Sequence, residues 1–597
     1  MVMPFFMTIY EFIKQKQTEY RQPIELADGW RWNMHDHLRR SFLYKNSQFE
    51  DENDNRELRP NKNIILPILN VQYRTEGFDV KDIELYVDDK DEYYKSFLVR
   101  KYHNNKWAPE NFIDTFIDEL VESYVDYGGV LIRRESSGRP EVMDLRSLAF
   151  CNQKNILANP FCFKHSLSPA ELREYTDWGQ TANGATISIE GFIDLCKDEK
   201  EIFVYELHGV LPREWLGEGD KKDILQAQIV AFYQPKDSQD KEGVTLYKRR
   251  EPKLPFKFLS RDEIRGRALG RGGIEELFEP QVWTNWNEIK ITEMLEAASK
   301  MIPWTTDKKI ASKHPSGLKG MDNLEFLELT EGSQVGTLDT YPRNLVVFNN
   351  AMERWQNQAQ LTGAVSETLL GETPSAGTPF KLFEAKQIED KSMHRYRQGK
   401  LATFMDEVYR DWIISDIERD LTNDQEFLSE LSADEMQEIA ENVVNQEYNR
   451  FVADKIINSK LDELTPEKID ALKNEAEVLR TDKKLLWMKN NKKFIQVFKK
   501  EFTKKLGVMT NIAGKQKNLA LLTDKVVNVL RQYLSTPQIR QDPEMTKLLN
   551  VILESSGLSP IMFGSQPQQT TQPPQPPQPA NASQPLRQLQ QLQTQLA

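Results

Sequence analysis

The sequence predicts an α+β protein whose C-terminal half is mostly helical. Between residues 61 and 260, short apolar runs alternate with an amphipathic segment and with charged loops. Two helical segments, 279–300 and 344–362, then flank an insert at 301–340 that is broken by prolines and glycines. From residue 381 to residue 563 the pattern is almost entirely helical. At roughly 150 residues per domain, the length allows about three to five domains or sub-domains.

The first half of the chain contains helices and strands that apolar spacing locates. Residues 1–13 are apolar but lack a basic n-region and a clear cleavage site, so we interpret them as the start of an amphipathic helix. A helix is predicted over 111–127, which Gly128 and Gly129 end. Its buried face is predicted from residues that recur every four positions: Phe112, Phe116, Leu120 and Tyr124. Strand-like runs follow at 130–132, 202–207, 229–233 and 254–258.

The middle of the chain is a helix, a broken insert, a second helix and a loop. The helix at 279–300 places four apolar side chains near one face: Trp283, Trp286, Ile289 and Leu295. The insert at 301–340 contains short strand-like pieces such as 324–329. After the helix at 344–362, the loop at 363–380 has glycines and prolines at its tip: Gly371, Pro374, Gly377 and Pro379. A long helix then runs to about residue 420, with Leu401, Phe404, Met405, Val408 and Trp412 on one face.

The last part of the chain is predicted to be helical and then to lose its globular composition. Thr422 and Ser432 each begin a capping-box pattern. Residues 483–505 carry nine lysines interleaved with aromatic residues. These lysines could face phosphate, but we favour an amphipathic helix with a lysine-rich outer face. After Gly564 the chain is rich in Gln and Pro, which predicts an extended or disordered tail with at most one short helix at its end.

The sequence contains none of the common catalytic signatures. There is no phosphate-binding loop, no H-E-x-x-H, no C-x-x-C and no G-x-S-x-G. His35 and His37 could form half of a metal site, but nothing completes it, so we interpret them as polar loop residues. The sequence has three cysteines, Cys151, Cys162 and Cys196. Such a small and odd number does not indicate a disulfide framework. We therefore expect no enzyme activity and no catalytic, cofactor-binding or metal site.

Charge and hydropathy restrict the partners of the chain. No run of about 20 apolar residues occurs, so we expect no membrane span. The formal net charge of −13 argues against a protein that grips DNA tightly by its phosphates, although it allows one past which DNA slides. A basic group at the start of the long helix comprises Lys381, Lys386, Lys391, Arg395, Arg397 and Lys400. Because acids are interspersed, composition alone favours a mixed, solvated face.

Five segments in order resemble the portal proteins of tailed double-stranded DNA bacteriophages. They are Asn61–Asn70, the Tyr124–Ile132 helix-to-strand passage, Pro140–Leu145 together with Ser166–Leu172, the pair Leu254–Phe256 and Gly270–Gln281, and Ala359–Gly371. Ser366 stands where many relatives have proline. The resemblance covers roughly residues 60–420, and the helical part beyond it is assigned by position only.

The resemblance implies a portal fold with an α/β wing, a two-helix stem, a small α/β clip, a tunnel loop and a largely α-helical crown. In this numbering the parts are as follows: a wing at 1–278, with an N-terminal extension at 1–60; a stem helix at 279–300; the clip at 301–340; a second stem helix at 341–364; the tunnel loop at 365–380; a long supporting helix at 381–420; the crown at 421–563; and the Gln/Pro-rich tail at 564–597.

The function implied is a ring, of twelve subunits in this family, at one capsid vertex, through which the genome is packaged and ejected. The partners implied are the major capsid protein, the terminase large subunit, head–tail adaptor or neck proteins, and duplex DNA in the channel. Such a protein is assembled in the host cytoplasm and resides in the virion. The candidate DNA-facing residues are Lys381, Lys386, Lys391 and Arg395, and the candidate clip residues are Lys308, Lys309, Lys313 and Lys319. The alternatives are another capsid or neck protein, or a nucleic-acid enzyme such as a nuclease.

Overall fold

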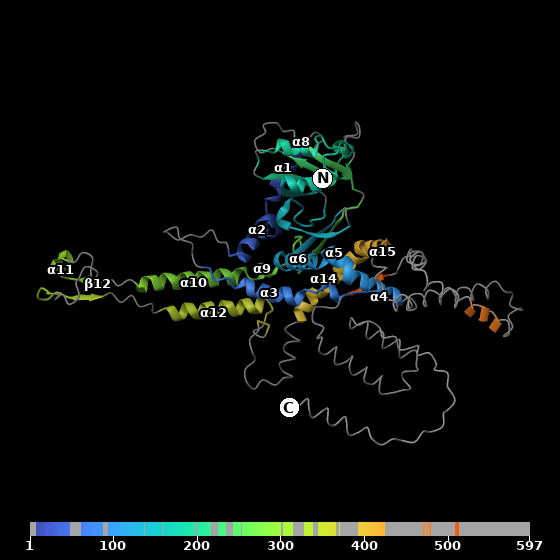
Figure 1. The fold of residues 1–597 in the computed structure, drawn as a ribbon. Helices are drawn as coiled ribbons and strands as arrows, with labels where there is room; N and C mark the ends of the chain where they lie inside the picture. Colours follow the sequence, from blue (N-terminus) through green and yellow to red (C-terminus); the bar gives the residue numbers. More distant parts are fainter. Residues whose placement is uncertain are drawn as a thin grey trace, which may run out of the picture. The chain divides into compact units, whose positions relative to one another are not determined.

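The computed structural model divides into two units, Met1–Lys515 and Gln516–Ala597, and the residues it describes all belong to the first (Figure 1). They are 8–47, 61–87, 93–135, 138–158, 160–197, 199, 201–216, 225–234, 243–251, 253–299, 303–313, 328–337, 344–365, 369–370 and 392–423, with short pieces at 470–471, 474–475, 477–478 and 508–512. The loop tip at Gly371–Pro379, most of the predicted crown, the lysine-rich segment 483–505 and the tail lie outside them.

The described residues combine helices with antiparallel sheets, which confirms the α+β class. The largest sheet has five strands in the order β10-β9-β8-β7-β6. These strands are Val244–Arg250, Leu225–Tyr233, Ile202–Pro212, Phe161–Leu167 and Leu148–Phe150. The strands predicted at 202–207 and 229–233 are thus confirmed and extended. Two short helices accompany this sheet, α7 (Pro169–Glu174) and α8 (Ile189–Leu195), and Ser168 and Glu171 form a reciprocal capping box at the start of α7.

A three-stranded sheet, β11-β4-β5, lies next to helix α6 (Ile113–Tyr127). Its strands are Phe256–Ser260, Gly129–Arg134 and Pro140–Met143. Phe116, Leu120 and Tyr124 are buried along α6, as predicted. Phe112 is not: it precedes the helix in the left-handed region (φ 54°), and 55% of its surface is exposed. Helix α6 therefore begins one residue after Phe112, which lies outside its buried face.

The passage from α6 to β4 depends on a close approach between two glycine segments. Gly128 ends α6 with φ 74°, and a Cβ atom there would lie 2.4 Å from the carbonyl oxygen of Gly270. The Gly128 carbonyl accepts hydrogen bonds from the backbone N–H groups of Arg261 and Gly270. Two of the sequence segments that led to the family resemblance therefore meet here, at a point where only a bare backbone fits.

The N-terminal residues form α1 (Ile9–Tyr20), a hairpin of β1 (Ile24–Ala27) and β2 (Trp30–Trp32), and α2 (Met34–Lys45). The interpretation of His35 and His37 as loop residues is wrong, because both lie in the first turn of α2 after the Asn33 cap. His37 is buried, and burial lowers its pKa to about 4. Within the described part of the chain, no cluster of three His, Cys, Asp or Glu residues could hold a metal ion.

The main core brings together α3 (Ile65–Glu76), α6 and the long helical run that starts at α14. This run is α14 (Ser392–Val408), a π-helical turn (Tyr409–Ile413) and α15 (Ile414–Asn423). The apolar stripe predicted on it is buried, from Leu401 to Trp412. The three cysteines are free and buried. None of the helices described has the length and apolarity that crossing a bilayer would require.

A strand from the C-terminal region pairs with the N-terminal half. β14 (Val508–Ile512) is antiparallel to β3 (Ile83–Val87), with Val508 opposite Val87 and Ile512 opposite Ile83. The prediction that this region is helical is wrong at these residues. Local periodicity could not show this, because the partner strand lies about 420 residues earlier in the chain.

Candidate functional site

The feature that the family resemblance singles out is a pair of helices, α10 (Phe278–Ser299) and α12 (Leu345–Thr362), which pack along each other (Figure 1). Trp283 stacks on Trp355, with ring centroids 6.0 Å apart and planes 10° from parallel, and Trp286 lies 6.1 Å from Phe348. A residue further along α10 thus meets one earlier in α12, so the two helices are antiparallel. Aromatic pairs of this kind add roughly 0.5–1.5 kcal/mol each beyond the area they bury.

Much of the apolar surface of this helix pair is uncovered in the single chain. Val346 and Val347 are 66% and 65% exposed. Exposed large apolar residues also occur further along both helices: Val282, Trp283, Trp286, Leu295 and Leu361. Scattered single apolar residues on a surface are ordinary, but such a series on two packed helices is typical of a surface that another molecule covers.

The base of α10 is tied to the segment that precedes α3. The Gln281 side chain accepts a hydrogen bond from the Ile64 backbone N–H (2.9 Å) and donates one to the Lys62 carbonyl (2.8 Å). The Asn285 side chain accepts from the Lys62 N–H (3.1 Å). Gln281 is buried, so these bonds satisfy polar groups that would otherwise be costly there. Sequence reasoning found both segments as motifs but not that they touch.

Between the two helices lies a small unit of two strands and a helix. β12 (Pro303–Thr305) pairs antiparallel with β13 (Val335–Thr337), and α11 (Lys308–Lys313) follows β12. Asp307 connects the parts: its carboxylate accepts from the backbone N–H groups of Lys309 (2.9 Å) and Thr330 (2.7 Å). These bonds, those from Thr330 foremost, hold its pKa at about 2. Insert residues 314–327, which include Lys319 and most of the strand predicted at 324–329, lie outside the described part.

Two of the four candidate clip residues can be located by their side chains. Lys308 and Lys309 are exposed in the first turn of α11. Lys313 ends α11, and its side chain is not described. The exposed lysines are available to a partner, but they sit at the positive end of the helix dipole and lack the geometry of a built site.

The candidate DNA-facing residues fall mostly outside the described residues. Lys381, Lys386 and Lys391 precede α14, and only Arg395 is seen, exposed on that helix. Arg397, which composition had placed on the same solvated face, is fully buried, and so is His394. Helical spacing explains why these two residues are buried. Residues 394, 397, 401, 405 and 408 follow one another at three- and four-residue steps, so His394 and Arg397 continue the apolar stripe of α14.

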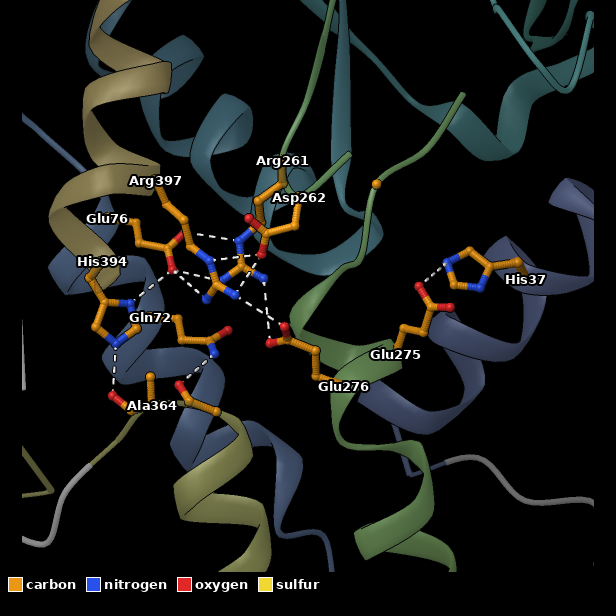
Figure 2. A network of polar contacts seen from close by, with 12 residues as sticks. His37, Gln72, Glu76, Arg261, Asp262, Glu275, Glu276, Ala364, His394 and Arg397 are labelled. Carbon is orange, nitrogen blue, oxygen red and sulfur yellow. Dashed lines mark hydrogen bonds and ion pairs between the residues drawn. The ribbon is translucent and has the colours of Figure 1, made fainter. Parts of the chain in front are cut away.

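Arg397 belongs to a buried network of charges that joins α3, α9 (Gly273–Glu276), α14 and the loop after β11 (Figure 2). Arg261 donates to both carboxylate oxygens of Glu76, at 3.0 and 2.6 Å. Arg397 donates to Asp262 (2.9 and 2.6 Å), to Glu276 (3.0 Å) and to Glu76 (3.4 Å). The Tyr124 hydroxyl of α6 donates to the Arg397 carbonyl. The network therefore connects the parts of the main core at one point.

The ionisation of the network follows from burial and pairing. Burial by itself would raise the pKa of Glu76, but Arg261, His394 and Arg397 together hold it at about 2. Burial raises the pKa of Glu276, against the opposing effect of Arg397 and Arg261. Buried ion pairs contribute little net stability, whereas removing one partner is costly because a charge is left without compensation. No sequence pattern indicated these pairings, since the residues are up to 321 positions apart.

A second buried cluster lies at the five-stranded sheet. The Glu206 carboxylate of β8 accepts a hydrogen bond from Arg133 (3.0 Å) and is hydrogen-bonded to His165 (2.8 Å). His208 is hydrogen-bonded to Glu251 at 3.2 Å. Although burial opposes its charge, the neighbouring carboxylates of Glu206 and Glu251, each 3.2 Å from a ring nitrogen, raise the pKa of His208 to about 9. His208 is 1% exposed, so the cluster offers no surface to a substrate and holds strands together.

Comparison with known proteins finds similar solved structures but no matching family model or curated sequence. No protein-family model matches the chain, and no curated protein matches its sequence. Among the solved structures that are similar to it, two match 64% of this chain and 81% of theirs. One is from the virion of a native gene transfer agent particle (10% identity, TM-score 0.30), and the other is from the neck of an empty particle of that kind (8% identity, TM-score 0.32). Similarities at this level do not assign the chain to a family.

Proposed function

We propose that this chain is a structural protein of a phage-like particle, and specifically the portal subunit that forms a ring-shaped DNA channel at one capsid vertex. The observation that carries the proposal is the antiparallel pair α10 and α12, joined through the small β12–α11–β13 unit, with exposed apolar side chains along both helices. In a ring, neighbouring copies would cover those side chains. Three of the sequence segments with the portal resemblance meet at the base of this pair, since Ile64 bonds Gln281 and Gly363 lies against Ile68.

The exposed valines show how a ring would gain stability. Val346 and Val347 are about two-thirds exposed in the single chain. Covering each of them would contribute roughly 1–2 kcal/mol per contact. Because a closed ring has no free end, this gain is repeated at every interface between subunits. A chain without such an assembly would leave this surface in water, at a cost in solubility.

The proposal includes the absence of catalysis. The titratable clusters around Glu76 and around Glu206 are buried and internally paired. The acidic net charge fits a channel that guides DNA through a few local cations and repels it elsewhere. Arg395, Lys308 and Lys309 are the proposed cations within the described residues.

The test is the oligomeric state of the purified chain, measured by native mass spectrometry and single-particle imaging. We expect a closed ring with a central channel. The double variant Val346→Asp with Val347→Asp should fold but fail to form rings, since both positions are exposed in the single chain. Leu195→Asp, at an exposed apolar position of α8, is the matched control and should leave rings intact.

Four results would count against the proposal. A wild-type chain that stays monomeric at high concentration would exclude the ring, and rings that persist in the double variant would exclude this surface. ATP turnover or metal-dependent DNA cleavage by the purified chain would favour a nucleic-acid enzyme instead. A ring without a channel wide enough for duplex DNA would favour another capsid or neck component.

A further inference from the structure

The end of α12 and the start of α14 are held together by one buried histidine. His394 contacts the Glu76 carboxylate through Nδ1 (2.9 Å) and the Ala364 carbonyl oxygen through Nε2 (2.9 Å). Figure 2 shows its ring between the charged network and the backbone of Ala364. Ala364 lies two residues beyond α12, and His394 is in the first turn of α14. His394 therefore links the residue just beyond α12 to the first turn of α14.

The partners of His394 define its protonation state. A backbone carbonyl can only accept a hydrogen bond, and an ionised carboxylate also only accepts. Glu76 is ionised, because Arg261 binds both of its oxygens. Both ring nitrogens of His394 must therefore donate, which requires the doubly protonated imidazolium.

The charges around the ring balance in this state. Glu76 from α3 contacts the ring directly. The other charged groups of the network are linked to Glu76 or to one another: Arg261 and Asp262 from the loop after β11, Glu276 from α9, and Arg397 from the same helix as His394. Three acids meet two arginines, so a protonated His394 supplies the third positive charge. His394 and Glu76 are nearly or fully excluded from water, where such a balance has its greatest effect.

The turn at Ala364, which the bond to His394 holds in place, has a strained backbone. Ala364 has φ 54°, in the left-handed region that costs roughly 1–2 kcal/mol for a residue with a side chain. Gly363 lies against α3, where a Cβ atom would be 2.6 Å from Ile68 Cγ2, and Gln72 of α3 donates to the Gly363 carbonyl (3.0 Å). A strained turn persists only while its surroundings hold it.

From this geometry we propose that His394 is a proton-dependent latch that fixes the C-terminal end of α12 to α3 and α14 and releases it when the ring loses a proton. A neutral imidazole donates through one nitrogen only. The carboxylate, as the stronger acceptor, keeps that donor, so the Ala364 carbonyl would face a nitrogen lone pair. The strained turn then loses the bond that holds it. The latch depends on contacts within one chain and stands or falls separately from the ring.

The test is hydrogen–deuterium exchange of the full-length protein over a series from about pH 5 to about pH 9. The readout is the protection factor of peptides that cover 357–365, which corrects for the intrinsic pH dependence of exchange. We expect protection to fall at least about tenfold as pH rises, because a hydrogen bond to a charged group is lost. Peptides of α7, which has no contact with His394, should show constant protection. Light scattering at each pH verifies that the oligomeric state is unchanged.

Variants separate the latch from other titrating groups. His394→Gln does not titrate, so the protection of its peptides should no longer depend on pH. His35→Gln removes an exposed histidine of α2 and should behave as the wild type. Constant protection in the wild type, or a pH dependence that survives in His394→Gln, would overturn the latch. If His394→Gln does not fold, the wild-type series alone decides.

Discussion

Replacing Arg397 by methionine should loosen α14 far more than the same change at Arg395, two residues away. Methionine keeps an unbranched apolar stem, although a shorter one, and removes every charged hydrogen bond. Glu276 and Glu76 are nearly or fully buried, so they lose a cation that water cannot replace. Asp262 is partly exposed, and solvent screens part of its loss. Removal of one partner from a buried pair costs about 3–5 kcal/mol.

Hydrogen exchange of α14 amides is a suitable assay, because a chain of this size need not unfold in one step. A cost of about 3–5 kcal/mol corresponds to exchange faster by roughly two to nearly four orders of magnitude. Arg395→Met, at an exposed position on the same helix, should change exchange by less than about threefold. The double variant Arg397→Met with Glu276→Gln should recover part of the loss, since it removes one of the uncompensated charges.

The reasoning fails if Arg397→Met and Arg395→Met exchange at similar rates. That result would mean that the network relaxes or hydrates when one cation is removed. The reasoning would also fail if Glu276→Gln further increased the exchange rate of Arg397→Met, because the two residues would then not be coupled through their charges.

Three further predictions concern the backbone and the second buried cluster. Gly128→Ala should destabilise the α6–β4 junction by more than about 2 kcal/mol, measured by hydrogen exchange of the amides of α6 and β4, because its Cβ would meet Gly270 and its φ is positive; a change below about 0.5 kcal/mol would refute the close approach. Phe112→Asn should change the stability by less than about 1 kcal/mol in the same assay, because the relief of a left-handed Phe offsets the loss of its covered ring surface and of its contact with Arg139; a destabilisation above about 3 kcal/mol would show that the strain is not relieved. The pKa of His208 is raised from its ordinary 6.5 to about 9, so its contribution is complete below pH 6.5 and is lost as pH rises through about 9; His208→Gln should flatten this alkaline slope, and His35→Gln should not.

Some of the architecture could be read from the sequence because short-range periodicity determines it. The four-residue repeat from Phe116 to Tyr124 specified α6, and the break between 300 and 344 separated α10 from α12. Phe112 misled the prediction, because apolar spacing shows which side of a helix it would occupy but not where the helix starts. The start depends on backbone dihedrals at one residue, which spacing does not encode.

The charged core could not be read in this way. Glu76, Arg261 and Arg397 resemble solvated residues, since their burial depends on partners brought together from distant segments. One local signal was present: His394 and Arg397 lie in step with the buried stripe of α14. A charged residue in line with an apolar helix face indicates one of two things: it is buried with a partner of opposite charge, or the buried face ends there. Only the pairing of the side chain in the structure distinguishes the two.

The pairing of β3 with β14 also concerns how the chain is made. On the ribosome, Ile83–Val87 emerges about 420 residues before Val508–Ile512. At about 5–20 residues per second, its edge would wait roughly 20–85 s for its partner. An unpaired edge readily pairs with other chains, so crowded nascent copies are open to mispairing in that interval. Any product that terminates early would keep the edge exposed, which would give quality control a direct way to tell unfinished chains from complete ones.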